Sequence, residues 1–490
     1  AIKKRRVTVT LYELLNGIKH DENIKDCEVV KVTCDNREVV AGTVFVCIKG
    51  QKFDGHDVVQ KAVESGASLV VCEKDVGLPQ QLVVANTREA YGIMCGNFYG
   101  NPAGKLKLIG ITGTNGKTTI SYLVKQLLED AGKRVGLIGT IHNEIGEMNV
   151  PATHTTPDPS ELHVLFSRMA LAGCEYVVME VSSHALDQHR LAGCHFDVGV
   201  FTNLTQDHLD YHGTMENYYA AKKSLFDICG TAVINIDDEY GLRLTKEVPC
   251  KVLTFSTDDD NADFIAKNIY SSATGSRFAL VTQNHIGRVN FCMPGKYSVS
   301  NALAAGVAAL AAGVSFEEAV KGLCECKGVT GRTELIVAEH PFTIIRDYAH
   351  TPDGLEKIIE SVREYATGRI ITLFGCAGNR DRSKRPKMAE IVARLSDYVI
   401  LTSDNPRDED PLQIINDAVP GFLEHKTPYK ILPNRYEAIE YALDFAKEGD
   451  ILLLCGKGHE DYQVLDFGTI CFDEKEIVLR MLKEKGEIPK

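Results

Sequence analysis

Short apolar runs alternate with amphipathic stretches along most of the chain. Residues 106–112 form an apolar run with the length of a buried strand. In residues 117–132, apolar side chains recur at the spacing of one helix face, and Gly132 suits the end of a helix. Residues 134–138 are again strand-like. A strand, a helix and a strand in this order predict a parallel sheet with right-handed crossovers.

The same alternation extends toward both ends of the chain. Near the N-terminus it predicts strands at 42–48 and 67–72, a helix at 57–65 and a linker at 101–104. Further along it predicts buried strands at 176–179 and 198–201 and a Gly/Ala-rich helix at 300–313. A chain of 490 residues is too long for one core. We therefore expect an α/β fold with three domains, residues 1–106, a central domain with a mostly parallel sheet at 107–332, and residues 333–490.

Three apolar runs in the last domain each end in a polar loop. Residues 370–374 lead into GCAGNRDRSKRP, 398–401 into TSDNPRDEDP, and 451–454 into CGKGHEDYQ. In open α/β sheets, ligands bind at the carboxyl ends of the strands, so these loops are expected to converge on one site. Asp-Asn-Pro also makes good turns, so Arg407 in the second loop has the alternative of a solvated surface turn.

Composition narrows the possible partners and the compartment. The net charge of −13 argues against a nucleic-acid-binding surface. No apolar run approaches the roughly 20 residues that a membrane span needs, and the N-terminus lacks the apolar core of a signal peptide. The fifteen cysteines form no C-x-x-C pair, which fits reduced thiols in the cytoplasm. We expect a cytoplasmic monomer that acts on small molecules.

The sequence GITGTNGKTTI at 110–120 carries the strongest local signal. A Gly-rich turn joins a predicted strand to a helix that begins near Lys117. Backbone N–H groups and a helix N-terminus can hold phosphates, Lys117 can neutralise them, and the Thr118 hydroxyl can bind Mg²⁺. The common P-loop would need Gly at position 111, where Ile stands, so the motif is a compact variant. The alternative is a chance turn.

Carboxylates, histidines and a lysine follow at other predicted strand ends. Glu180 ends the run at 176–179 and could reach a nucleotide-bound metal, or be an ordinary strand-end residue. The segment 202–226 holds His208, His212 and Lys222. Its Asp and His content also permits zinc, although no cysteine joins it, and Lys222 beside Lys223 could simply be solvated.

These motifs together resemble the ATP-dependent Mur ligase family. The shared segments are GTNGKTT, NLTQDHLDYH, AAKKSLF, YSVSNALAA, GRTE and DYAHTPD. TTPDP, EVSSHALDQHR, GCAGNRDRSKRP, DNPR and GKGHEDYQ narrow the resemblance to its diaminopimelate-adding members. The segments appear in the family order over essentially the whole chain.

The resemblance implies an enzyme, an acid–amino-acid ligase that forms ADP. It would add meso-2,6-diaminopimelate to UDP-N-acetylmuramoyl-L-alanyl-D-glutamate through an acyl phosphate, in cytoplasmic peptidoglycan precursor synthesis, with ATP and two Mg²⁺ ions. The implied domains are a small UDP-binding α/β domain, a central P-loop ATPase and a C-terminal Rossmann-like domain that binds the amino acid.

The resemblance also assigns site residues by position. For ATP they are Gly113, Thr114, Asn115, Gly116, Lys117, Thr118, Thr119, Asn301, Arg332 and Asp347. For the UDP-muramoyl dipeptide they are Asn36, Gln51, Thr155, Thr156, Ser182, Gln188 and Arg190. For diaminopimelate they are Arg380, Asp404, Asn405, Pro406, Arg407, Gly456 and Glu460. The metal ligands are Thr118, Glu180, His208 and Lys222, the last as a carbamylated lysine.

Two positions depart from the family pattern, and three alternatives stay open. Asn36 stands where Ser is common, and His154 precedes the Thr pair. Arg407 favours diaminopimelate, because its guanidinium can bind the second, distal carboxylate of diaminopimelate, which lysine lacks. The alternatives are the lysine-adding ligase, a folylpolyglutamate synthetase, and a P-loop protein that uses ATP as a switch.

Overall fold

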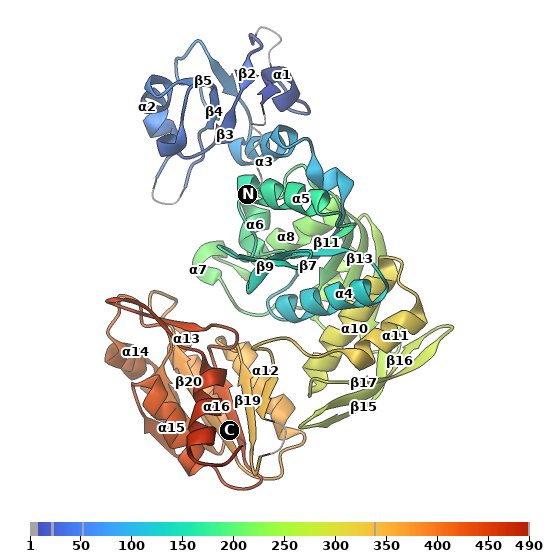
Figure 1. Ribbon diagram of the computed structural model, residues 1–490, viewed down its shortest axis with the longest axis vertical. Coiled ribbons are helices and arrows are strands. Elements are labelled where there is room, and N and C mark those ends of the chain that lie inside the picture. The colour runs from blue at the N-terminus through green and yellow to red at the C-terminus, as the bar shows by residue number, and fades with distance from the viewer. Residues whose placement is uncertain (1–7, 21–23, 51–52, 338–339, 489–490) are drawn as a thin grey trace.

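Three sheets of four or more strands organise the chain, as the computed structural model shows for residues 8–20, 24–50, 53–337 and 340–488. The N-terminal part lies at the top of Figure 1, the central part in the middle and the C-terminal part below. The fold is α/β, as predicted. We propose domain boundaries at 106/107 and 332/333, because each of the three resulting ranges carries one of these sheets.

The N-terminal sheet has four parallel strands in the order β3-β4-β5-β6. Their bounds are Lys31–Thr33, Thr43–Val46, Ala67–Cys72 and Gln81–Val83. The helix predicted at 57–65 begins as the 3₁₀ turn Gly55–Val58 and continues as α2, Val59–Glu64. The apolar pattern did not predict α3, Thr87–Phe98, whose first turn is capped by the side chain of Asn86.

The central sheet has eleven strands in the order β10-β9-β8-β11-β7-β12-β13-β14-β15-β16-β17. Strands β8, β11, β7, β12, β13, β14 and β15 run parallel. The bounds of β7 to β12 are Lys107–Thr112, Val135–Ile138, His142–Ile145, Met148–Pro151, Tyr176–Glu180 and Phe196–Phe201. Those of β13 to β17 are Cys229–Asn235, Lys251–Ser256, Phe264–Ser272, Gly275–Thr282 and Ile286–Phe291.

Helices cover both faces of the central sheet. They are α4 at Lys117–Asp130, α5 at Pro159–Leu171, α6 at Ser183–Asp187, α7 at Leu209–His212, α8 at Met215–Lys223, α9 at Glu239–Leu244, α10 at Lys296–Ala311 and α11 at Phe316–Glu325. The buried faces of α4 and α10 pack together over the sheet. Helix α10 begins four residues before the predicted helix at 300–313. The predicted linker forms the 3₁₀ turn Pro102–Lys105, which packs against α5.

The C-terminal sheet has six strands in the order β18-β19-β23-β20-β21-β22. Their bounds, in chain order, are Glu334–Val337, Thr343–Asp347, Ile370–Cys376, Tyr398–Ser403, Tyr429–Ile431 and Ile451–Cys455. The covering helices are α12 at Pro352–Arg363, α13 at Lys384–Leu395, α14 at Pro411–Ala418, α15 at Arg435–Phe445 and α16 at Glu474–Glu484. Because β23, β20 and β21 are neighbours, the three predicted loops leave the same edge side by side.

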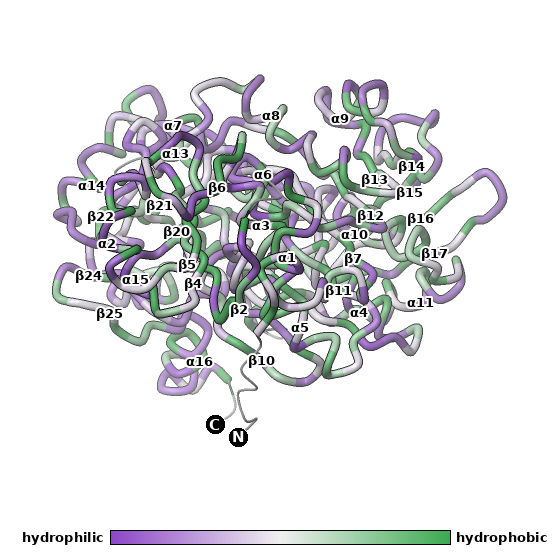
Figure 2. The backbone as a smooth tube through the Cα atoms, turned by 90° about the horizontal axis from the view of Figure 1, so that it is seen from above, coloured by the Kyte–Doolittle hydropathy of each residue, from purple (hydrophilic) through white to green (hydrophobic). Residues whose placement is uncertain are grey.

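Apolar side chains line the interior of each part. Figure 2 shows hydrophobic stretches along the inner strands and hydrophilic ones on the outer loops and helix faces. The strands β4, β11, β20 and β23 are buried over every residue, which explains their unbroken apolar runs. Among the described residues, no helix is long and apolar enough to cross a membrane.

Candidate active site

The Gly-rich turn between β7 and α4 has a backbone that only glycine fits. Gly113 has φ of 147°, and a Cβ there would lie 1.8 Å from Thr202 Oγ1. Gly116 has φ of 89°, and a Cβ there would lie 2.5 Å from Asn301 Oδ1 on α10. The turn therefore fits tightly against its neighbours, and α4 begins at Lys117 directly after it. This is the geometry of a phosphate-binding loop.

Lys117 folds back over this loop. Its ammonium donates to the carbonyls of Gly113 (3.0 Å) and Thr114 (2.8 Å). Burial lowers the pKa of Lys117, against the attraction of Glu180 and Asp207. A lysine held at the loop in this way can neutralise phosphate charge.

Glu180 gathers hydroxyl groups beside the loop. Its carboxylate accepts hydrogen bonds from Thr118 Oγ1 (2.9 Å), Thr140 N (2.8 Å) and Thr140 Oγ1 (3.0 Å), and the residue is buried. Arg332 Nη2 donates to the same Thr118 hydroxyl at 3.0 Å. Carboxylate and hydroxyl oxygens are the donors that Mg²⁺ takes, so Thr118 and Glu180 fit such an ion.

Lys222 is buried, so the solvated alternative is wrong for this residue. Its ammonium donates to Gly113 O at 2.7 Å and lies 4.6 Å from the centre of the Tyr218 ring. Burial, together with the charge of Lys117, lowers the pKa of Lys222 well below its ordinary value. Lys223 instead pairs with Glu247 at 2.9 Å and is partly exposed.

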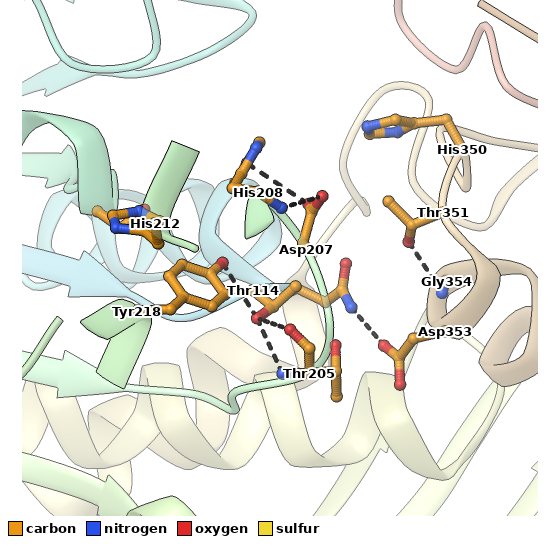
Figure 3. Close-up of polar contacts among 12 residues, drawn as sticks. Thr114, Thr205, Asp207, His208, His212, Tyr218, His350, Thr351, Asp353 and Gly354 are labelled. Carbon is orange, nitrogen blue, oxygen red and sulfur yellow. Dashed lines mark hydrogen bonds and ion pairs between the residues drawn. The ribbon is translucent and has the colours of Figure 1, made fainter. Parts of the chain in front are cut away.

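Both histidines of segment 202–226 lie against the Tyr218 ring, with centroid distances of 6.2 Å for His208 and 4.9 Å for His212. His208 is half-exposed, with its Nε2 3.4 Å from Asp207 Oδ2, and Figure 3 shows the pair above Thr114 and Tyr218. His212 Nε2 lies 2.9 Å from Ser183 Oγ. Within the described ranges, no group of three or more His, Cys, Asp and Glu side chains is placed to hold a metal ion, so the zinc alternative finds no ligand set there.

A cavity of about 400 Å³ lies between the central and C-terminal domains. Asn115, Asn301, Arg332, Asp347 and Tyr348 are among the residues that line it. The Arg332 guanidinium lies 4.5 Å from the centre of the Tyr348 ring. Burial raises the pKa of Asp347, although its carboxylate accepts from the backbone N–H groups of Thr333 and Ala349. The cavity opens beside the phosphate loop, so one nucleotide could contact both.

Four of the residues predicted for the muramoyl peptide form one hydrogen-bonded group. Thr156 Oγ1 accepts from Ser182 N at 3.0 Å, and Arg190 Nη1 donates to Thr156 O at 2.8 Å. Arg190 Nη2 also donates to Gln188 Oε1 at 2.8 Å. Thr155 lies beside the metal-binding candidates, since its hydroxyl is 3.1 Å from that of Thr140.

A second cavity, of about 1610 Å³, separates the N-terminal domain from the central one. Lys49, Gly50 and Arg88 line it from one side and Gln188 and Tyr211 from the other. Asn36 lies in the 3₁₀ helix Asn36–Glu38 of the N-terminal domain. Gln51 falls outside the described residues. The cavity is large enough for an extended ligand that links the two domains.

The three C-terminal loops meet as predicted. Asn405 Nδ2 donates to Glu460 Oε2 at 2.8 Å, which joins the loops after β21 and β23. Arg407, at φ of 55°, donates from Nη1 to Gly378 O at 2.6 Å, which joins the loops after β21 and β20. The Arg407 side chain is partly exposed, so its role in ligand binding stays a prediction. Arg380 lies exposed at the outer end of its loop.

Other residues of these three loops, which together form the loop cluster, pack closely against one another. Asp404 is buried, and a Cβ on Gly456 would lie 3.4 Å from its Oδ2. Pro406 is also buried, and its carbonyl would lie 1.9 Å from a Cβ on Gly378. Arg407 thus projects from a turn whose backbone is fixed on both sides.

Sequence reasoning missed several residues that the structure brings to the site. Thr140 follows β8 and bonds to Glu180, and Lys384 at the start of α13 pairs with Asp207 across the interdomain gap. Lys457 is buried among Asn405 and Glu460. The sequence signal for these two lysines was their place in quoted motifs, Lys384 in GCAGNRDRSKRP and Lys457 in GKGHEDYQ.

Family models match three consecutive parts of the chain. Residues 28–92 match "Mur ligase family, catalytic domain", residues 111–309 match "Mur ligase middle domain", and residues 331–458 match "Mur ligase, glutamate ligase domain". The chain belongs to the Mur ligase family.

Relatives of this Mur ligase extend over almost its whole length. It is 47% identical to a UDP-N-acetylmuramoyl-L-alanyl-D-glutamate–2,6-diaminopimelate ligase of Clostridium acetobutylicum, covering 96% of this chain and 97% of that one. A ligase of the same name from Clostridium perfringens is 44% identical, with 97% and 100% covered. A solved structure of a ligase of this name superposes with a TM-score of 0.70 at 33% identity, covering 94% and 96%.

The folylpolyglutamate synthase of Mycobacterium tuberculosis shares the fold alone. It superposes with a TM-score of 0.61 at 17% identity and covers 76% of this chain. The matches to the Mur ligases also include the N-terminal segment 28–92.

Proposed function

We propose that this Mur ligase joins meso-2,6-diaminopimelate to UDP-N-acetylmuramoyl-L-alanyl-D-glutamate at the expense of ATP, as a step of peptidoglycan precursor synthesis in the cytoplasm. The observation that carries the proposal is that the phosphate loop and the loop cluster predicted to bind the amino acid lie on neighbouring domains. A phosphate loop contacted by Lys117 and the buried Lys222 stands on one domain, and the Arg407 loop cluster stands on the next. The near-full-length likeness to ligases of that name supports the same substrates.

The reaction begins with activation of a carboxylate. The free D-glutamyl carboxylate attacks the γ-phosphorus of ATP. The bond between this phosphorus and the β-phosphate oxygen breaks, ADP departs, and the substrate becomes an acyl phosphate. The amine of diaminopimelate then attacks the acyl carbon, and phosphate departs from the tetrahedral intermediate. The chain contributes positioning and charge neutralisation, which dominate phosphoryl transfer.

The residues 113–119 and Lys117 would hold the β- and γ-phosphates. Asn301, Arg332 and Asp347 would contact the nucleotide in the cavity of about 400 Å³. Arg332 already reaches Thr118 at the phosphate loop from the domain boundary (3.0 Å), which supports a nucleotide gripped from two sides. Closure over this cavity would keep water from the acyl phosphate.

Thr118, Glu180, His208 and Lys222 would hold two Mg²⁺ ions. Bound there, the ions would neutralise charge on the transferring phosphate. Lys222 fits a carbamylated ligand, because burial favours its neutral amine and a neutral amine reacts with CO₂. The carbamate would turn a cation into an anionic oxygen ligand, the kind Mg²⁺ prefers.

The remaining residues would position the two organic substrates. Thr155, Thr156, Ser182, Gln188 and Arg190 would contact the muramoyl dipeptide, and Asn36 and Gln51 would contact the uridine. Arg380, Asp404, Asn405, Pro406, Arg407, Gly456 and Glu460 would surround diaminopimelate. The protein would act as a monomer on these small molecules.

Arg407 supports diaminopimelate over lysine. Its guanidinium can pair with the distal carboxylate of diaminopimelate, whereas lysine would leave it without that partner. The test incubates the protein with ATP, Mg²⁺ and the UDP-muramoyl dipeptide, and adds either amino acid. We expect ADP and tripeptide with diaminopimelate and little with lysine. Formation of product with lysine but not with diaminopimelate would reassign the enzyme to the lysine-adding type. ATP hydrolysis that does not depend on any amino acid would contradict a ligase.

A further inference from the structure

Lys457 is the first residue after the Gly456 turn that follows β23, and its side chain is fully buried. Its ammonium donates to Asn405 Oδ1 (2.6 Å), Glu460 Oε2 (3.0 Å) and Tyr462 O (2.7 Å). Three N–H donors thus meet three acceptors, which is what a buried ammonium requires. Lys457 thereby ties the loop after β21 to the loop after β23.

Lys457 and the residues assigned to diaminopimelate include two carboxylates, Asp404 and Glu460, and three cations, Arg380, Arg407 and Lys457, of which Arg380 is exposed. Lys457 Nζ lies 3.0 Å from Glu460 Oε2 and 3.5 Å from Asp404 Oδ1, so this one ammonium pairs with both carboxylates. The four groups other than the exposed Arg380 sum to zero charge, which matches a ligand end that is itself neutral overall. Such an end carries one ammonium and one carboxylate, as the distal carbon of diaminopimelate does.

One carboxylate oxygen in the cluster remains available to a ligand. Asp404 Oδ1 is buried and has no hydrogen-bond partner within the described parts of the chain, and its ion pair with Lys457 Nζ is long, at 3.5 Å. Glu460 Oε2, by contrast, already accepts from Asn405 and Lys457. A buried carboxylate oxygen without a hydrogen bond costs free energy, which an arriving ammonium would recover. Lys457 therefore hydrogen-bonds to Glu460 and leaves Asp404 Oδ1 without a hydrogen bond.

We propose that Lys457 is a positioning residue that determines amino-acid specificity. It cancels one of the two carboxylates, so that the pocket accepts a zwitterionic side-chain end and disfavours a lone ammonium such as that of lysine. Without Lys457, the cluster would hold an excess negative charge, which suits lysine better. This inference rests on the proposed function of the same site.

The test compares wild-type protein with Lys457→Met and Lys457→Gln, each assayed with diaminopimelate and with lysine. We expect the ratio of kcat/KM for diaminopimelate to kcat/KM for lysine to fall by at least about 10-fold in both variants. The loss with diaminopimelate is expected in KM rather than kcat. Lys457→Arg keeps the charge and is expected to retain more of the wild-type ratio than either neutral variant.

Lys475→Met serves as the matched control. Lys475 pairs with Glu334 at 2.8 Å in the same domain, and its loss is expected to leave the ratio unchanged. An equal fall in kcat/KM for both amino acids would make Lys457 purely structural and overturn the inference, as would failure of both neutral variants to fold. If the wild type ligates neither amino acid, the proposed function itself fails, which is a distinct result.

Discussion

At the scale of single residues, burial separates side chains that are identical in the sequence. Lys222 and Lys223 are consecutive, yet Lys222 is buried against the phosphate loop and Lys223 lies in a partly exposed ion pair. Desolvation opposes the charged form of Lys222. The different surroundings give the two lysines different chemistry.

Replacement of Lys222 by alanine is expected to lower kcat by about 100-fold or more, because a metal ligand beside the transferring phosphate is lost. Added acetate or propionate is expected to restore part of the rate by supplying the missing carboxylate. Steady-state ADP release measures both effects. Lys223→Ala is the control and is expected to keep most of the activity; near-normal turnover of Lys222→Ala would remove this lysine from the mechanism.

Arg407→Ala is expected to raise KM for diaminopimelate by about 10-fold or more, because a charge-assisted contact to the distal carboxylate is lost. KM for ATP should stay unchanged, since the phosphate loop lies on another domain. Initial rates at varied diaminopimelate and varied ATP separate the two constants. Arg382→Ala removes a partly exposed ion pair with Asp417 nearby and serves as the control. An unchanged KM in Arg407→Ala would place this residue outside the pocket.

At the scale of elements, strand ends and helix starts hold most of the site. The turn between β7 and α4 combines positive φ angles with close approach to β12 and α10. The loops after β20, β21 and β23 are likewise joined to one another, by the Asn405–Glu460 side-chain hydrogen bond and by the bond from Arg407 to the Gly378 carbonyl. These elements fix their functional groups because neighbouring strands fix the ends of each loop.

Gly113→Ala is expected to abolish ATP binding and to destabilise the central domain, because its Cβ would meet Thr202 Oγ1 at 1.8 Å. Gly132→Ala is the matched control. Gly132 also has a positive φ, 76°, but nothing lies within 4 Å of its Cβ position. The control should cost about 1–2 kcal/mol of stability and leave ATP affinity intact. Calorimetric titration with ATP and thermal melting test the pair; equal ATP affinities would contradict a closely fitted loop.

His163 links α5 to α3 of the N-terminal domain and gives a pH-dependent stability. Its buried ring packs against Phe166 and Gly96, and burial lowers its pKa to about 4. The unfolded chain takes up this proton near pH 6.5, so stability is full above that pH and falls as the pH drops toward 4. The loss is about 3 kcal/mol.

Urea unfolding at several pH values tests His163→Leu against the wild type. The variant is expected to have a flatter pH dependence between pH 6.5 and 4, because leucine takes up no proton. His285→Leu, which alters a largely exposed histidine, is the control and should follow the wild type. Parallel curves for His163→Leu and wild type would assign the acid sensitivity to other groups.

At the scale of the whole molecule, a few polar contacts join the central and C-terminal domains. Lys384 pairs with Asp207, and Asn115 with Asp353. Burial would raise the pKa of Asp207, but His208 and Lys384 lower it to about 2. The stabilisation from Asp207 is therefore present above its unfolded pKa of 3.8 and is lost as the pH falls toward 2.

Lys384→Met is expected to let the two domains separate, because Asp207 loses its interdomain partner. We expect a larger radius of gyration in small-angle scattering and more ATP hydrolysis without peptide product, since water would reach the acyl phosphate. Lys387→Met, at an exposed position of the same helix, is the control. In the wild type the ion pair should persist between pH 8 and 5, because Asp207 remains ionised throughout. Scattering curves that coincide for variant and wild type would deny the pair a role in closure.

The sequence by itself determined the α/β class, the order of the main strands and helices, and the motifs of the site. Apolar runs at 106–112, 370–374 and 451–454 each became a buried strand, because a strand covered on both faces leaves an unbroken apolar signal. Helix α3 and the antiparallel strands β15 to β17 gave no such signal, since their burial is mixed.

Only the tertiary structure decided which charged residues are buried and what they contact. The burial of Lys222, the pairing of Lys384 with Asp207 and the place of Lys457 among the Asn405 and Glu460 side chains join segments far apart in sequence. The local pattern of apolar residues indicates the periodicity of one helix or strand, whereas desolvation and ion pairing depend on residues that the fold brings together from distant segments. The motifs could therefore be predicted from the sequence, but the burial and pairing of their charged side chains could not.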